Sequence, residues 1–409
     1  MEDGLQRAVG SMVHHAGMLR IDVAERRRRL GLRHALSPAA RAGDPVEAAQ
    51  RVVALHATDP ATVFLAAWAR TDSVAPAAVA EALYEQRTLV RMLGMRRTMF
   101  VVPSDLRGVI EESTMPRIAA VQRRLLVKHL RELTAVVDPE PWLADVERSV
   151  LRALAARGGT ATAEQLAGDE PRLRTRLVMA EGKPYQAIQT ITSRVLLLLG
   201  AQGLIVRGLP TGSLLSQRYQ WTLAEQWLPP AGELLPPAQA RTELARRWLT
   251  AFGPAPLADL QWWTGWPKSE VKQAVAELHG REVDLDGSPG VVLPDDVGMS
   301  PGPGPWAALL PALDPTVMGW LDRGWFLGGH QKELFDRTGN AGPTVWLDGR
   351  VVGGWAQRAD GEIAVKFLDD VGGDADDLVQ AEAARLREWL GDLRVIPRFR
   401  TPLERELAG

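Results

Sequence analysis

Three segments rich in proline and glycine constrain the fold of this chain most strongly, because neither a helix nor a central strand continues through them. These segments are residues 137–141, 228–237 and 300–305. A chain of 409 residues is long enough to bury a core in more than one domain. We therefore expect four units, namely residues 1–137, 138–232, 233–299 and 300–409.

The second unit has the clearest order of elements. Apolar residues spaced three and four apart predict a helix over 141–154, a short helix over 160–166 and a longer one over 187–198. Two segments typical of strands follow, residues 204–207 and 217–221, joined by a loop that contains glycine and proline. Three helices followed by a two-stranded wing is the order of a winged helix.

The third unit repeats this order, and the first unit fits it more loosely. In the third unit we expect helices at 242–250, 256–264 and 267–278 and strands at 282–285 and 291–293. In the first unit we expect helices at 45–57, 60–70 and 76–93 and a strand at 95–102. No residue-level repeat links the units, so a helical protein with incidental hairpins is the alternative.

The fourth unit is predicted to be rich in β-structure. Strand-like segments at 344–347 and 350–355 flank Asp348-Gly349, a pair that favours the tight turn of a hairpin. A further strand is expected at 362–367 and a terminal helix at 378–390. The predicted fold class is thus α+β and mainly helical, with three tandem winged-helix units and a C-terminal β-rich unit that ends in a helix.

The charge balance restricts how this chain could bind a polyanion. Its formal net charge is −2 and its isoelectric point is about 6.4, so it lacks the basic excess that is common in nucleic-acid-binding proteins. Binding phosphates would require that the charges are segregated. Basic clusters at 26–29, 117–131 and 172–176 could do this, although each is also typical of a solvated helix face.

Several classes of chemistry are disfavoured by composition. The chain has no cysteine, which removes disulfides, thiol catalysis and cysteine-ligated metals. Its seven histidines show no metal-ligand spacing, and no glycine-rich nucleotide motif is present, so we expect no metal and no cofactor. We also see neither a secretory signal nor an apolar run of about 18 residues, and we expect a cytoplasmic protein without membrane contact.

The residues best suited to chemistry are His56, Thr58 and Asp59. Asp44 and Pro45 predict the start of a helix, and we expect His56 and Thr58 at its far end. A purely structural interpretation is available, because the helix dipole favours a histidine near a helix C-terminus and an aspartate before a proline is a common N-cap.

A resemblance favours the catalytic interpretation. Residues 51–59 resemble the catalytic helix of the AlkZ/YcaQ-type DNA glycosylases, which usually carries Gln-x-Gln or Gln-x-Asp. Four other segments resemble motifs of that family in the same order: Met95–Phe100, the Gly-Pro-Ala and Trp-Trp segment at 252–265, the Leu-Leu-Pro and Asp segment at 309–314 with Asp322-Arg323 following, and the hairpin at 343–355. The resemblance covers about residues 17–390.

This resemblance implies three tandem winged helices that close around DNA and remove alkylated purines, including the bulky adducts and crosslinks that antibiotics make. The chain departs from the family pattern, because His56 and Thr58 replace the two glutamines and Phe100 replaces a histidine. Histidine can orient a water molecule and also accept its proton. We assign His56 to water activation, Thr58 to its support, and Asp59 to stabilising positive charge on the sugar.

The expected partner is double-stranded DNA that carries alkylated bases, bound by a monomer in the nucleoid. Arg91, Arg96 and Arg97 are candidate phosphate contacts, and Arg350 after the hairpin turn could enter a groove. Arg91, Arg96 and Arg97 are equally explained as solvated arginines on a strand, and exposure at a turn accounts for Arg350 at least as well as a groove contact does. Trp262 and Trp263 are predicted to pack in the core rather than to stack on bases.

Two functions therefore stay open, with an interaction scaffold as a weaker third. The first is a monofunctional DNA glycosylase, which needs His56, Thr58 and Asp59 in a polar pocket open to a concavity of DNA size. The second is a non-catalytic winged-helix DNA-binding protein, a regulator or a damage-recognition module, in which His56 would be buried.

Overall fold

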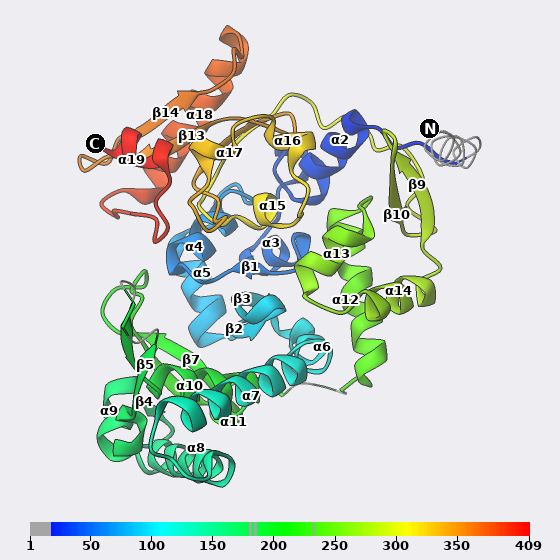
Figure 1. Cartoon of the computed structure of the whole chain (residues 1–409). Coiled ribbons are helices and arrows are strands. Elements are labelled where there is room, and N and C mark those ends of the chain that lie inside the picture. Colours follow the sequence, from blue (N-terminus) through cyan, green and yellow to red (C-terminus); the bar gives the residue numbers. More distant parts are fainter. Residues whose placement is uncertain (1–17, 180–181, 184–185, 231, 233) are drawn as a thin grey trace. The chain divides into compact units, whose positions relative to one another are not determined.

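The chain divides into two units in the computed structural model, which describes residues 18–179, 182–183, 186–230, 232 and 234–409 (Figure 1). The discontinuous unit combines residues 1–79 with 241–409, and the central unit consists of residues 80–240. Helices outnumber strands in this mixed fold, in agreement with the predicted α+β class. In the described part of the chain, no helix combines the length and apolar character needed to cross a bilayer.

The central unit begins with a π-helical turn, Glu81–Glu85, and its described residues continue through seven strands and six α-helices. Its elements are β2 (Leu89–Gly94), β3 (Thr98–Pro103), α6 (Arg107–Ser113), α7 (Met115–Leu133), α8 (Pro139–Ala156), β4 (Thr160–Ala161), α9 (Ala163–Asp169), β5 (Arg176–Met179), β6 (Ala187–Thr190), α10 (Thr192–Ala201), β7 (Ile205–Pro210), β8 (Tyr219–Leu223) and α11 (Ala224–Trp227).

Local sequence signals explain several of these elements. Pro139 occupies the first turn of α8, where a missing N–H costs nothing. Thr162 and Gln165 form a capping box that begins α9. β4, β8 and β7 form an antiparallel sheet in the order β4-β8-β7, and α7, α8, α9 and α10 bury apolar side chains in one core with it. The predicted helices and strands of residues 141–221 are thus largely confirmed.

Two helix predictions in the central unit are wrong in part. The helix expected over 76–93 stops early, because Leu89–Gly94 forms strand β2, paired antiparallel with β3. All six residues of β2 are buried, and a short apolar run of this kind does not distinguish a strand from a helix. The helix expected from residue 187 begins at Thr192 instead, since Ala187–Thr190 pairs with β5 as strand β6.

The discontinuous unit contains the remaining elements. They are α2 (Val23–Arg33), the 3-10 turn Pro38–Ala40, α3 (Pro45–Arg51), β1 (Leu55–His56), α4 (Pro60–Trp68), α5 (Pro76–Ala80, whose last residue lies in the central unit), α12 (Pro237–Phe252, most of it in this unit), α13 (Leu257–Thr264), α14 (Lys268–Glu277), β9 (Arg281–Leu285), β10 (Ser288–Val292), β11 (Ala307–Leu310), α15 (Pro315–Met318), α16 (Gly324–Leu327), α17 (Gln331–Leu334), β12 (Thr344–Leu347), β13 (Arg350–Gln357), β14 (Ile363–Phe367), α18 (Gly373–Leu390) and α19 (Pro402–Ala408).

An antiparallel sheet with the order β11-β12-β13-β14 organises the C-terminal part of this unit, and α18 and α19 lie beside it (Figure 1). The predicted hairpin is confirmed. Asp348 and Gly349 have φ angles of 46° and 84°, the left-handed values that a tight type I′ turn needs. A Cβ added at Gly349 would lie 2.6 Å from the Cβ of Arg27, so the turn packs closely against α2.

Aromatic side chains form much of the core of this unit. Trp248 stacks on Phe252, with ring centroids 5.6 Å apart, and Trp263 lies 6.4 Å from each of these rings. The prediction that Trp263 packs in the core is confirmed, since only 5% of it is exposed. Trp262 is half-buried, beneath the guanidinium of Arg323 at 5.2 Å.

A fully buried polar network joins α2, α4 and α15. Arg70 donates two hydrogen bonds to the carboxylate of Asp314, at 2.9 and 2.7 Å, and a third to the Thr316 hydroxyl at 2.8 Å. The His34 ring contacts the same hydroxyl through Nδ1 at 2.8 Å and the carbonyl of Ala251 through Nε2 at 3.1 Å. Burial and the charge of Arg70 lower the pKa of His34 well below its ordinary value.

This network predicts a loss of stability in mild acid. The unfolded chain protonates His34 near pH ~6.5, whereas the folded chain keeps it neutral, so the unfolded state binds more protons as the pH falls. We expect the free energy of unfolding, measured by urea denaturation, to fall between pH 7 and pH 5. His34→Gln should flatten this dependence, and His279→Gln, at an exposed histidine, should not. An equal slope in the His34→Gln protein would contradict the prediction.

Candidate active site

The candidate catalytic segment lies between α3 and α4. Helix α3 ends at Arg51, and the left-handed conformation of Val53 (φ 66°) follows. His56 then lies in the short strand β1. The helix expected over 45–57 is therefore wrong beyond Arg51, and the helix dipole does not account for the presence of a histidine at this position.

His56 is largely removed from solvent, with 7% of its surface exposed. Its neighbours Leu55 and Ala57 are buried as well, and Thr58 is half-buried. Little of the His56 side chain is therefore accessible to water. Burial of His56 is the arrangement expected for the non-catalytic alternative. The catalytic interpretation requires that a water molecule reach this buried imidazole.

Asp59 is held by hydrogen bonds to both of its carboxylate oxygens. Oδ1 accepts the backbone N–H of Ala61 at 3.1 Å, which makes Asp59 the N-cap of α4. Oδ2 accepts the backbone N–H of Arg398 at 2.8 Å. Asp59 therefore caps α4 and also has its carboxylate held in a fixed orientation. The residue as a whole is 4% exposed.

Burial raises the pKa of Asp59, and the hydrogen bonds from Arg398 and Ala61 offset only part of this rise. The carboxylate is the form that stabilises positive charge nearby. Asp59 therefore loses this form at a higher pH than an ordinary aspartic acid, whose pKa is about 3.9.

Arg398 is a residue of this site that the sequence argument missed. Besides its backbone contact with Asp59, its guanidinium donates a hydrogen bond to the carbonyl of Thr58 at 3.1 Å. It lies 340 positions from Thr58 in the chain, so no local pattern links the two. The only signal in the sequence was three arginines within residues 394–400.

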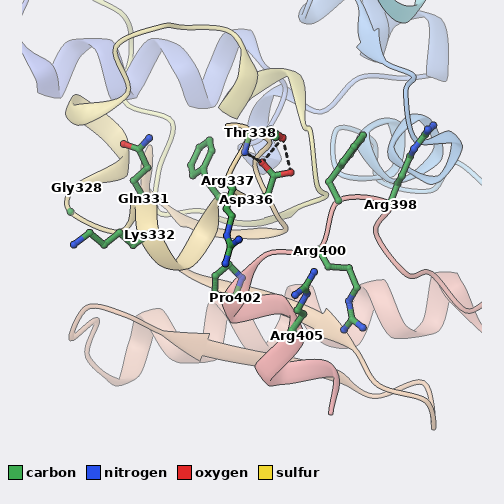
Figure 2. A pocket seen from close by; sticks show the side chains of 13 residues that line it. Gly328, Gln331, Lys332, Asp336, Arg337, Thr338, Arg398, Arg400, Pro402 and Arg405 are labelled. Atoms are coloured by element: carbon green, nitrogen blue, oxygen red, sulfur yellow. Dashed lines mark hydrogen bonds between the residues drawn. The ribbon is translucent and has the colours of Figure 1, made fainter. Parts of the chain in front are cut away.

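A broad basic hollow adjoins Arg398. Its volume is about 1300 Å³, and its lining includes Lys332, Arg337, Arg398, Arg400 and Arg405 (Figure 2). Asp59 itself lines a separate cavity of about 10 Å³, which is no larger than a single water molecule requires. A nucleobase does not fit in that smaller cavity.

The candidate phosphate contacts Arg91, Arg96 and Arg97 belong to the central unit, and they differ in exposure. Arg91 lies in β2 and is only 6% exposed. Arg96 is half-buried, whereas Arg97 is exposed and donates a hydrogen bond to the side chain of Gln122 at 3.1 Å. Arg97 is thus the most accessible of the three, and their contact with DNA stays a prediction.

Arg350 lies in the discontinuous unit, directly after the hairpin turn. It is half-buried, and its Nη1 lies 3.9 Å from the Asp369 carboxylate. The turn before it is in contact with α2 through Gly349 and Arg27, so that the tip of this hairpin is already occupied. Entry of Arg350 into a DNA groove stays a prediction. The packing of the turn against α2 leaves less room for DNA at this position.

In the described part of the chain, no group of three histidine, aspartate or glutamate side chains is arranged to hold a metal ion. The candidate segment itself supplies an imidazole, a hydroxyl and a carboxylate. These groups lie within four consecutive residues, His56 to Asp59.

Comparison with known proteins identifies the class of this chain. The chain belongs to the AlkZ-like DNA glycosylase family, whose sequence model matches residues 49–389. The structure of Streptomyces sahachiroi DNA glycosylase AlkZ is similar, with a TM-score of 0.72, 20% sequence identity, and coverage of 92% of this chain and 98% of that chain. Among curated proteins no match is found. The resemblance indicated by the five motifs is thus confirmed.

Proposed function

We propose that this chain is a monofunctional DNA glycosylase that hydrolyses the N-glycosidic bond of alkylated purines in double-stranded DNA. The observation that carries the proposal is the fixed segment from His56 to Asp59, which lies inside the region matched by the family and is joined through Arg398 to a basic hollow. We further propose that it acts in the cytoplasm on nucleoid DNA, as a monomer and without a cofactor.

The reaction needs few groups. A purine alkylated at N7 carries a positive charge and is already a good leaving group, so its departure needs little acid catalysis. The electron pair of the glycosidic bond leaves with the purine, and positive charge develops on the sugar. A carboxylate such as Asp59 stabilises that charge most effectively where water is largely excluded.

Water completes the reaction at C1′. In our proposal His56 orients this water and accepts its proton as the bond between oxygen and C1′ forms. Thr58, whose hydroxyl both donates and accepts hydrogen bonds, supports the water or the imidazole. Because the charge of the leaving group comes from N7, the same scheme extends to bulky antibiotic adducts, and a role in self-resistance follows from it.

We also propose that residues 1–137, 138–232 and 233–299 are winged-helix units and that 300–409 form the β-rich unit. The order α8, β4, α9, α10, β7 and β8, with the β5-β6 hairpin inserted between α9 and α10, supports this for the second unit. The order α12, α13, α14, β9 and β10 supports it for the third, where an antiparallel bridge between Ala255 and Val291 adds a third strand position.

The direct test is release of a free base. The protein is incubated with a duplex oligonucleotide that contains one N7-methylguanine, and the released base is identified by mass spectrometry. We expect release of N7-methylguanine and of no unmodified base. Tight binding of the duplex without release would overturn the proposal.

Burial of His56 and the loss of both family glutamines favour a second candidate, a non-catalytic DNA-binding protein that regulates genes or recognises damage. Such a protein would bind DNA without base release. A regulator would in addition prefer one sequence over others at constant salt. The same incubation, combined with binding to duplexes of differing sequence, separates the two candidates.

The raised pKa of Asp59 predicts the acid limit of catalysis. Protonation removes the carboxylate, so base excision should decline as the pH falls, with a midpoint above the value of about 3.9 for ordinary aspartate. Single-turnover rates between pH 4 and pH 8, corrected for spontaneous depurination, measure this midpoint. In a His56→Gln background, which has no second ionisable group in the proposed mechanism, adding Asp59→Asn, which keeps an acceptor for the Arg398 N–H, should lower the rate and remove that limb of the profile. Persistence of the limb in the variant would contradict the assignment.

A further inference from the structure

The basic hollow lies in the C-terminal part of the discontinuous unit, where the segment around α17 faces the chain that leads into α19 (Figure 2). Five of its lining residues are basic and one, Asp336, is acidic. The whole chain has a net charge of −2, so the charge of this lining is much more positive than that of the chain as a whole. Like charges repel, so a cluster of cations is electrostatically unfavourable unless an anion binds there.

Within the described residues, Asp336 forms no ion pair with any of these cations, because its oxygens are bound by its own loop. Its carboxylate accepts hydrogen bonds from the backbone N–H groups of Thr338 at 2.8 Å and Asn340 at 2.9 Å. It also accepts them from the Thr338 hydroxyl and from the Asn340 side chain at 2.8 Å. These bonds fix the loop of residues 336–340 and occupy both oxygens. The bonds to Asn340 and Thr338 lower the pKa of Asp336 against the opposing effect of burial.

The basic side chains fall into two groups. Arg400 is paired with Glu404 at 2.7 Å, and Arg398 is bound to the carbonyl of Thr58. Among the described residues, no carboxylate forms an ion pair with Lys332, Arg337 or Arg405, and all three are exposed. Figure 2 shows the guanidinium of Arg398 pointing away from the side chains of Arg337, Arg400 and Arg405. Three cations are therefore available to an external anion.

We propose that this hollow, through Lys332, Arg337 and Arg405, binds backbone phosphates of the DNA strand. The inference rests on the proposed function, whose site it extends. The volume of about 1300 Å³ is far larger than one phosphate needs, and guanidinium groups suit phosphate oxygens. Of the two phenylalanines in the lining, Phe335 is buried, with 5% exposed, and Phe399 is half-buried beside the guanidinium of Arg398, 5.5 Å from its ring centroid. The exposed part of the lining is therefore mainly basic. The lining thus fits a strand backbone and sequence-independent contact.

Arg398 connects this phosphate surface to the candidate catalytic segment. Its backbone N–H fixes the carboxylate of Asp59, and its side chain reaches Thr58, while the same residue lines the hollow. A strand bound in the hollow is therefore held by the chain segment that positions Asp59. In this proposal the hollow supplies affinity and register, and Arg398 links it to Thr58 and Asp59.

The test measures DNA affinity against salt concentration. Arg337→Ala/Arg405→Ala removes two of the three available cations, and Arg152→Ala/Arg387→Ala removes two exposed arginines elsewhere that form no ion pair within the described residues. The probe is an unmodified duplex between 50 and 200 mM KCl. We expect the slope of log K against log[KCl] to become shallower by about 2, since each phosphate contact contributes about 0.9. The control pair should leave the slope unchanged.

Two further arms make the result decisive. Arg337→Lys/Arg405→Lys should restore the slope, because the charge is retained. Slopes equal to the control in the alanine variant would overturn the proposal, and so would a loss of affinity for inorganic pyrophosphate with DNA binding unchanged, which would indicate a small phosphate ligand. If the slope falls as expected while the wild-type protein releases no N7-methylguanine, the hollow stands and the glycosylase proposal fails.

Discussion

His56→Ala should lower the single-turnover rate of N7-methylguanine release by about 100-fold, the lower range for the loss of a general base. The expected change in activation free energy is about 2.7 kcal/mol. The reason is that water at C1′ would lose the group that orients it and accepts its proton in the proposed mechanism. Rates are measured with enzyme in excess over the modified duplex, so that product release does not mask the chemical step.

Two matched variants separate chemistry from structure. His279→Ala removes an exposed histidine and should leave the rate unchanged. His56→Gln introduces the residue that the family usually carries here, which orients water but cannot take its proton. It should retain more activity than His56→Ala, because the amide can still orient the water. Full activity in the His56→Ala protein would remove His56 from the mechanism.

Arg70→Met should destabilise the folded protein by about 3–5 kcal/mol, because it leaves the carboxylate of Asp314 buried without its counter-charge. Both side chains are fully buried. A typical domain is stable by only about 5–15 kcal/mol, so this loss is a large part of the total. Urea denaturation followed by circular dichroism measures it.

Replacing both partners provides the internal control. Arg70→Met/Asp314→Leu removes the unpaired charge and should be more stable than Arg70→Met alone. Lys366→Met breaks an exposed pair with Glu406 and should cost less than about 1 kcal/mol. If Arg70→Met cost no more than Lys366→Met, the buried pair would not have the role assigned to it.

Local signals in the sequence predicted many of the elements. Asp348-Gly349 has the two left-handed residues of its turn, and α13 (Leu257–Thr264) and α14 (Lys268–Glu277) match their expected spans closely. Such features depend on neighbouring residues only, through turn conformation and apolar spacing. Motifs in the same order likewise indicated the family before the fold was known.

Predictions failed where pairing with distant residues decides the conformation. Leu89–Gly94 is apolar enough for a buried helix, and its antiparallel partner β3 makes it a strand. Ala187–Thr190 is a strand because it pairs with β5. In both cases backbone hydrogen bonds to another segment outweigh local propensity, which differs between conformations by a fraction of a kcal/mol per residue, about 0.5 or less.

The sequence by itself determined the family and the positions of the proline- and glycine-rich segments that interrupt helices and strands. It also determined which residues between 56 and 59 carry an imidazole, a hydroxyl and a carboxylate. Only the tertiary structure decided that His56 is buried, that Asp59 is fixed by the N–H of Arg398, and that a basic hollow adjoins them. The physical reason is that solvent exposure and hydrogen-bond partners depend on how the chain closes on itself. Residues 59 and 398 meet only when the N- and C-terminal parts of the discontinuous unit pack together.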